Sequence, residues 1–163
     1  MRGVKSYLTL SVITLLSFII HQAVAETIRI PVAKDLYADS QTARENRQPM
    51  VLLVSQEHCP FCVRIKQDVL HPIIKADDYQ GQILMRELFI DLDHTVTGFQ
   101  GGSHSSAAIA RSYGVDLTPT LLFLGPDGEE LAERIIGYYT PEMFFFYVDQ
   151  AIRESIDQLE SVN

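Results

Sequence analysis

The sequence predicts an α/β fold in which a mixed central sheet is flanked by helices, with a strand and a helix added at its N-terminal side. Three observations predict this class. Apolar runs typical of strands alternate with segments of helical periodicity, which favours parallel strands joined by helices. The turn sequence Gly125-Pro126-Asp127-Gly128 then connects two strand-like runs as a hairpin. An amphipathic helical segment follows the hairpin.

The first 25 residues have the pattern of a secretory signal peptide. Arg2 and Lys5 supply positive charge, residues 7–20 form an apolar run, and Ala23-Val24-Ala25 has the small-x-small form of a cleavage site. The apolar run is shorter than the ~20 residues that span a bilayer. We expect export, cleavage after Ala25 and one domain over residues 26–163, and an uncleaved membrane anchor is the alternative.

The next segment contains two predicted strands and a helix. Residues 27–32 alternate weakly, and Pro31 indicates a strand at the edge of the sheet. Asp35 is placed to cap a helix over residues 36–46. The unbroken apolar run over residues 50–54 is typical of a buried strand.

A second helix is predicted to begin soon after this buried strand. Pro60 suits the first helical position, where a missing N–H group costs nothing. The dipeptide His71-Pro72 is expected to stop or kink the helix. The buried side of the helix is predicted to carry Cys62, Ile65, Val69 and Leu70.

The rest of the chain continues the alternation. Thr140, Pro141 and Glu142 give the last helix a hydroxyl cap, a proline at its first position and an acid in its first turn. The other predicted elements are a strand over residues 83–91, a polar, glycine-containing loop over 93–105, a helix over 106–113, and the hairpin strands over 120–124 and 130–138.

The charge of the chain argues against nucleic acid as a partner. The net charge is −8, from 21 acidic and 13 basic residues, and no basic stripe is visible. Such a chain repels phosphate backbones. The loop over residues 93–105 contains His and Asp side chains that suit a metal or a partner protein, and a solvated connection is the alternative.

The two cysteines carry the predicted chemistry. Cys59 and Cys62 are the only cysteines, and they lie between a buried strand and a helix. A helix N-terminus offers unpaired N–H groups and a partial positive charge, which favour a reactive thiolate at Cys59. Cys62 lies one turn into the helix. We therefore expect Cys59 to attack a disulfide and Cys62 to resolve the mixed disulfide that results.

The same cysteine spacing is compatible with two alternative roles. A purely structural disulfide is one, although a bridge across so short a loop removes little chain entropy. A zinc site is the other, and it would need about four ligands. The two cysteines would have to be joined by His58 and His71, which lie at opposite ends of the helix. We expect no metal and no cofactor other than the Cys59–Cys62 disulfide.

The sequence resembles the thioredoxin fold over about residues 35–160. The resemblance rests on the strand–CPFC–helix arrangement, on Thr118-Pro119-Thr120 before an apolar strand, and on the closing hairpin and helix. It implies a cis Thr118–Pro119 bond whose backbone groups lie beside the dithiol and pair with a client strand. Pro60 and Phe61 lie between the cysteines and are expected to help tune or bind. The chain is most similar to periplasmic thioredoxin-related proteins, including the SoxW-like group.

The chain departs from the best-known thioredoxins at three places. It has no tryptophan, whereas tryptophans flank their dithiol. Leu53 occupies the position at which those thioredoxins carry a buried aspartate, which can accept and return the proton of the second thiol. Glu57 and Glu87 are the candidate substitutes. His58 precedes Cys59, and a protonated imidazole there would favour the thiolate.

The resemblance implies a monomeric periplasmic thiol–disulfide oxidoreductase acting on client proteins. We expect a reductase that receives electrons from a membrane protein of the DsbD type. A disulfide-introducing oxidase of the same fold is one alternative. A redox-inactive module that binds client proteins, as a chaperone does, is the other.

Overall fold

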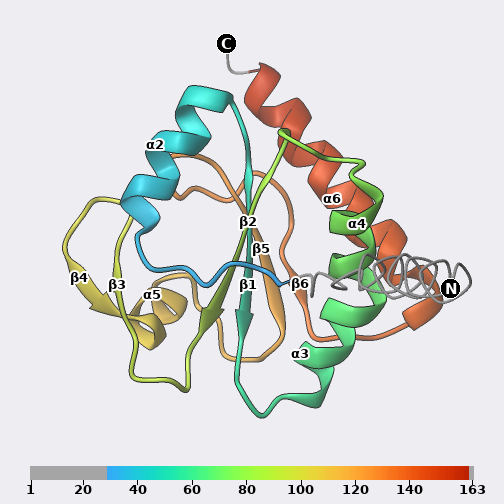
Figure 1. Cartoon of the computed structure of the whole chain (residues 1–163), viewed down its shortest axis with the longest axis horizontal. Coiled ribbons are helices and arrows are strands. Elements are labelled where there is room, and N and C mark those ends of the chain that lie inside the picture. The colour runs from blue at the N-terminus through green and yellow to red at the C-terminus, as the bar shows by residue number, and fades with distance from the viewer. Residues whose placement is uncertain (1–28, 162–163) are drawn as a thin grey trace, which may run out of the picture.

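The structure, a computed structural model, describes residues 29–161, so the predicted signal peptide lies outside the described residues. Its central sheet has four strands in the order β2-β1-β5-β6 (Figure 1). Strand β1 (Met50–Ser55) is parallel to β2 (Leu84–Phe89) and antiparallel to β5 (Thr120–Leu124), and β6 (Ile135–Ile136) is antiparallel to β5. The predicted mixed sheet is confirmed.

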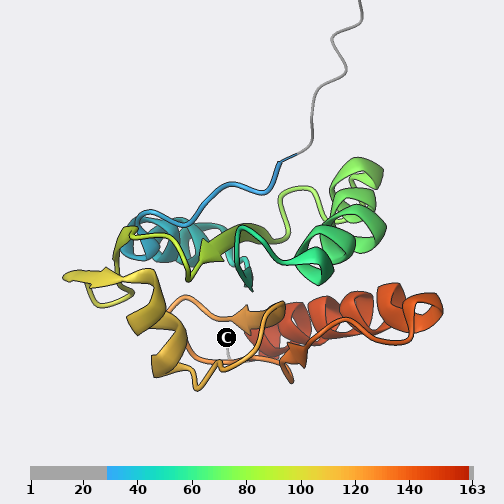
Figure 2. The same ribbon diagram turned by 90° about the horizontal axis from the view of Figure 1, so that it is seen from below.

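Helices cover both faces of this sheet. Helices α2 (Leu36–Asn46) and α5 (Ser106–Ser112) lie on one side in Figures 1 and 2. On the other side are α3 (Pro60–Ile65), α4 (His71–Ala76) and the long α6 (Pro141–Ser161). The result is a three-layer α/β/α arrangement with β1 in the interior of the sheet.

The burial of β1 on both faces explains its unbroken apolar sequence. Val51 and Leu53 belong to the apolar core under α6, whereas Met50, Leu52 and Val54 belong to the core under α2 and α5. Neighbouring side chains of a strand point to opposite faces, so a strand covered on both sides needs apolar residues at every position. This burial holds the C-terminal end of β1 in a fixed place.

A π-helical turn, η1 (Lys66–Leu70), joins α3 to α4. The His71 N–H donates to the Lys66 carbonyl, five residues back. Pro72 lacks an N–H group, and its ring would clash with the carbonyl four residues earlier in a regular helix. The helix therefore does not stop at His71-Pro72 but continues to the end of α4 through a widened turn.

The prediction of a loop over residues 93–105 is wrong in part. It contains a hairpin of β3 (Thr95–Thr97) and β4 (Ser103–Ser105), which pair with each other. Gly101 and Gly102 have φ values of 79° and 77°, a region that glycine reaches at little cost, and they turn the chain between the strands. Short polar strands lack the apolar alternation by which strands are predicted.

The returning strand predicted over residues 130–138 is shorter than expected. Only β6 and a single bridge between Leu124 and Glu130 pair with β5. The Leu131 N–H still donates to the Phe123 carbonyl at 2.8 Å, and then the ladder is interrupted until β6. At the other edge of the sheet, residues 29–33 run beside β2, where Val32 forms a parallel bridge with Glu87.

The cap of α2 gives a first testable prediction. An oxygen of the Asp35 carboxylate accepts the Ala38 N–H at 2.9 Å. Asp35→Ala should lower the free energy of unfolding by about 1 kcal/mol, because this N–H loses its partner. Denaturant unfolding measures the change. The matched control is Glu45→Ala, an exposed substitution on the same helix, and equal effects of the two variants would contradict the assignment of the cap.

Candidate active site

The chain leaves the end of β1 in a short loop that hydrogen bonds hold in place. The Ser55 carbonyl accepts the Ile90 N–H at 3.0 Å, which extends the pairing with β2 by one residue. The Glu57 N–H then donates to both carboxylate oxygens of Asp91, at 2.9 and 3.1 Å. The loop of residues 56–58 is therefore tied to the end of β2 just before the first cysteine.

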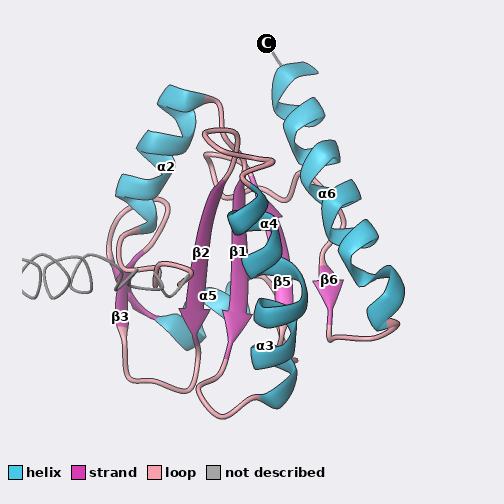
Figure 3. Cartoon of the chain, turned by 45° about the vertical axis from the view of Figure 1, so that its right-hand side comes forward, coloured by secondary structure: helices cyan, strands magenta, loops and turns pink. Residues whose placement is uncertain are grey.

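Cys59 and Cys62 form a disulfide at the start of α3. Figure 3 shows α3 connected to the end of β1 by a short loop. Cys59 is the N-cap residue, and its sulfur accepts the Cys62 N–H at 3.1 Å. Pro60 occupies the first position of the helix, as predicted. Cys59 is 8% exposed and Cys62 is fully buried. A partner can therefore reach Cys59 more easily than Cys62, while the attacking and resolving roles of the two cysteines stay predictions.

The Thr118–Pro119 segment lies against the disulfide. The peptide bond between the two residues is cis. The Thr118 hydroxyl lies 3.8 Å from the Cys59 sulfur. The Pro119 carbonyl accepts the Gly137 N–H at 2.7 Å, and the Thr120 hydroxyl donates to the Leu117 carbonyl at 2.8 Å. These bonds hold the segment in place while Thr118 faces the first cysteine.

Two large apolar side chains beside the dithiol are exposed to solvent. Phe61, between the cysteines, is 54% exposed, and Leu117, next to Thr118, is 64% exposed. Exposed apolar side chains of this size next to a reactive sulfur offer contact area to a bound protein chain. The sequence predicts a tuning or binding role for Phe61 and overlooks Leu117.

The structure does not bring His58 against the dithiol sulfurs. Its side chain is 89% exposed, and the contact found for it is with the Glu57 carboxylate at 4.0 Å. Exposed charges act weakly because water and salt screen them. The tuning role of His58 therefore stays a prediction.

A buried polar cluster joins the end of β1 to the helical segment that carries the cysteines. One oxygen of the Glu87 carboxylate accepts the Ser55 hydroxyl and the Lys66 ammonium, both at 2.7 Å. Glu87 is 4% exposed and is the only buried acidic residue among residues 29–161. Lys66 lies one helical turn after Cys62, so the two side chains share a face of the helix.

The register of the sheet explains how Glu87 reaches this place. Glu87 on β2 is the direct neighbour of Leu53 on β1. Side chains at paired positions point to the same face of a sheet. The carboxylate therefore enters from the neighbouring strand, on the face that Leu53 shares. The sequence suggests Glu87 only as a candidate, because its partners Ser55 and Lys66 lie 32 and 21 residues away along the chain.

His71 gives a prediction about the pH dependence of stability. Burial lowers the pKa of His71 below its ordinary value of 6.5, the Lys66 charge lowers it further, and Glu87 opposes both effects in part. The unfolded chain therefore takes up this proton more readily than the folded protein. The stabilising contribution of neutral His71 is fully present above about pH 6.5 and is lost as the pH falls through the folded-state pKa.

The comparison of two histidine variants checks this sign. Between about pH 7 and pH 5, His71→Gln should lose less stability than the wild-type protein, because the titrating group is gone. Thermal unfolding at several pH values measures the slope of protein stability against pH. His94→Gln, at an exposed position, is the matched substitution against which the His71→Gln slope is compared. A His71→Gln slope equal to that of the wild-type protein would contradict the prediction.

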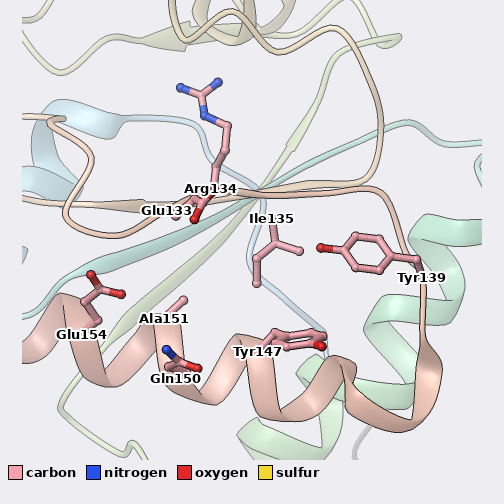
Figure 4. A pocket seen from close by; sticks show the side chains of 8 residues that line it. All are labelled: Glu133, Arg134, Ile135, Tyr139, Tyr147, Gln150, Ala151 and Glu154. Carbon is pink, nitrogen blue, oxygen red and sulfur yellow. The ribbon is translucent and has the colours of Figure 1, made fainter.

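Two further features of residues 29–161 bear on where a site could lie. Within the described range, no three His, Cys, Asp or Glu side chains form a group able to hold a metal ion. A pocket between β6 and α6 is bordered by Tyr139 and Tyr147 (Figure 4). Arg134 at its rim already donates to Glu130. None of the predicted site residues lines this pocket.

Comparison with known proteins agrees with this geometry. The family model for a thioredoxin-like domain matches residues 36–152. Mitochondrial thioredoxin 3 from Saccharomyces cerevisiae is 20% identical, with a TM-score of 0.51 over 77% of this chain and 94% of that one. A DsbH oxidoreductase is 15% identical, with a TM-score of 0.55 over 79% and 92%. Thioredoxin from Fasciola hepatica is 16% identical, with a TM-score of 0.52 over 77% and 99%.

These structural likenesses establish the fold, while the family match covers most of the chain and includes both cysteines. No curated protein matches the sequence. The family, the fold and the paired cysteines agree on the class of chemistry. The chain belongs to the thioredoxin-like domain family and is a thiol–disulfide oxidoreductase.

Proposed function

We propose that the protein is a periplasmic reductase that exchanges its Cys59–Cys62 dithiol with disulfides of client proteins. The observation that carries the proposal is the disulfide at the N-terminus of α3, with the Thr118 hydroxyl 3.8 Å from the Cys59 sulfur. A reactive sulfur beside unpaired backbone groups and exposed apolar side chains suits a protein substrate better than a small molecule.

The reaction transfers two electrons to the client. The Cys59 thiolate attacks one sulfur of the client disulfide, a mixed disulfide forms, and one client thiolate leaves. The Cys62 thiolate then attacks the Cys59 sulfur and releases the second client thiolate. The client disulfide is reduced, and the Cys59–Cys62 disulfide is formed. A dithiol donor must then reduce the protein again.

The backbone of Thr118 is available to hold an extended client segment. Pro119 already uses its carbonyl to bind Gly137. Among residues 29–161, the N–H and C=O groups of Thr118 have no hydrogen-bond partner. A client strand could pair with these groups as strands pair in a sheet. Phe61 and Leu117 would then contact the client residues that flank its cysteine.

Glu87 is our candidate for handling the Cys62 proton. Cys62 is fully buried, so its thiol needs an internal group to accept its proton before it can attack. Position 53, where a carboxylate would serve, is leucine. Glu87 lies at the neighbouring position of the sheet and is bound to Lys66 on the redox helix. Buried titratable groups with a specific charge partner are often found at functional sites.

The compartment and the direction of electron flow are part of the proposal. The signal-like sequence of residues 1–25 supports export. Resemblance to periplasmic thioredoxin-related proteins supports reduction, with a DsbD-type membrane protein as donor. No helix within residues 29–161 is long and apolar enough to cross a membrane. An oxidase recharged by a quinone-linked partner would use the same site in reverse.

Two measurements test the proposal. Reduction of insulin disulfides with a small thiol as donor tests turnover, and equal protection of an aggregating client by Cys59→Ser would favour the client-binding alternative. The reduction potential tests the direction. A potential near about −270 mV, as in thioredoxin, supports a reductase, whereas one near about −120 mV, as in DsbA, supports an oxidase.

A further inference from the structure

The Thr118 hydroxyl lies between two acceptors. It donates to the side-chain oxygen of Gln56 at 2.7 Å, and the Cys59 sulfur is 3.8 Å away. A hydroxyl has a single proton to donate. A disulfide sulfur accepts hydrogen bonds weakly, so in the oxidised protein the proton is directed at Gln56.

This contact joins two segments that are held separately. Gln56 follows the last residue of β1, and the next N–H in the chain, that of Glu57, is bound by Asp91. Thr118 is held on the other side of the disulfide by the bonds around Pro119. The side chain of Gln56 is therefore kept within reach of Thr118, 62 positions away along the chain.

We propose that Gln56 is a positioning residue for Cys59. When the disulfide is reduced, Gln56 acts on the Cys59 sulfur through the hydroxyl of Thr118. This proposal rests on the exchange reaction proposed above. Reduction adds two electrons from a dithiol donor and breaks the sulfur–sulfur bond. Cys62 takes one proton, Cys59 remains a thiolate, and the second proton goes to solvent. The new thiolate is a strong acceptor and draws the Thr118 proton toward itself.

The amide of Gln56 suits this change because it carries both an acceptor and a donor. When the Thr118 proton turns to the thiolate, half a rotation of the amide places its NH₂ group against the Thr118 oxygen. A chain of hydrogen bonds then runs from the Gln56 N–H through the Thr118 O–H to the Cys59 sulfur. Each bond in such a chain polarises the next, so Gln56 stabilises the reduced form without touching the sulfur.

A carboxylate at position 56 would break this chain. It has no hydrogen to donate, and it holds the Thr118 proton more strongly than the amide does. Gln56→Glu should therefore raise the pKa of Cys59. It should also lower the equilibrium constant for reduction by glutathione about threefold to tenfold, the effect expected for the loss of one hydrogen bond of ordinary strength. Thr118→Val should act in the same direction, whereas Thr118→Ser keeps the hydroxyl and should resemble the wild-type protein.

A double-mutant cycle separates the hydrogen-bond chain from simple charge. The four proteins are the wild type, Gln56→Glu, Thr118→Val and the double variant. In each, the pH dependence of alkylation of Cys59 gives its pKa, and equilibration with glutathione gives the constant for reduction. Most of the Gln56→Glu effect should vanish in the Thr118→Val background, because no hydroxyl is left to carry it. Thr118→Ala is a second background, should Thr118→Val fold poorly.

Two carboxylate changes serve as controls. Gln158→Glu makes the same substitution at an exposed position of α6, and it should leave both quantities unchanged. Glu57→Gln removes a charge next to Gln56 and measures the direct effect of charge near the dithiol. A Gln56→Glu effect that is equally large with and without the Thr118→Val substitution would overturn the inference while leaving the exchange function intact. A wild-type disulfide that exchanges with no thiol would overturn the function itself.

Discussion

Cys59→Ser is expected to reduce insulin-disulfide reduction to the background rate of the small thiol donor alone. The hydroxyl of serine is not a nucleophile for disulfides, and Cys62 is fully buried and cannot be reached by a client in its place. The fold should survive, because a two-residue bridge contributes little loop entropy. Steady-state turnover and a thermal melt of the same preparation measure the two effects.

Cys62→Ser is the matched variant for this prediction. It keeps the attacking thiol and loses the resolving thiol, so it should form a mixed disulfide with a client and retain it. Mass spectrometry without reductant detects the trapped species. Trapping by Cys59→Ser, rather than by Cys62→Ser, would reverse the roles assigned to the two cysteines.

Glu87→Gln is expected to slow the resolving step about 10²-fold, at the lower end of the range for general acid–base catalysis. The amide has nearly the same shape and can still accept the Ser55 and Lys66 hydrogen bonds, but it cannot take the Cys62 proton. The variant should also lower the free energy of unfolding by about 1–3 kcal/mol, because the Lys66 ammonium, 21% exposed, keeps a hydrogen bond but no longer faces an opposite charge. Rapid mixing of a preformed mixed disulfide measures the rate of release.

Asp39→Asn on α2 provides a matched control, because Asp39 pairs with Arg86, which is next to Glu87 on β2 and therefore points to the other face of the sheet. Asp39 forms an ion pair with Arg86 at 2.6 Å, and its side chain is 14% exposed. Its replacement also converts a partly buried carboxylate to an amide and should cost comparable stability. It should leave the resolving rate unchanged. Equal slowing by Asp39→Asn and Glu87→Gln would reduce the role of Glu87 to stability alone.

Much of the fold can be predicted from local pattern. The predicted helix over residues 36–46 and its Asp35 cap coincide with α2, and the apolar run over residues 50–54 coincides with β1. These elements are marked by a cap, a periodicity or an unbroken apolar run within a few residues. The β3–β4 hairpin escapes prediction because its strands are short and polar. The length of β6 cannot be predicted either, because the point at which its hydrogen bonds to β5 are interrupted depends on both strands together.

The residues of the candidate site also fall into those that the sequence predicts and those that it does not. Cys59, Cys62 and Pro60 are adjacent in sequence, and the strand before them and the helix after them suffice to predict a redox pair at a helix N-terminus. Gln56 has no such signal, because its partner Thr118 is 62 positions away. Leu117 is one residue from a predicted site residue, but its exposure is known only once the fold is known.

By itself the sequence determined the class of the fold and the reacting sulfurs, because caps, periodicities and a two-residue spacing act over one or two turns of chain. Only the tertiary structure decided which groups surround those sulfurs. Strand register placed Glu87 beside Leu53, and chain reversal brought Thr118 to Cys59. The physical reason is that burial and hydrogen bonding between distant segments depend on the simultaneous packing of all elements, which no local pattern contains.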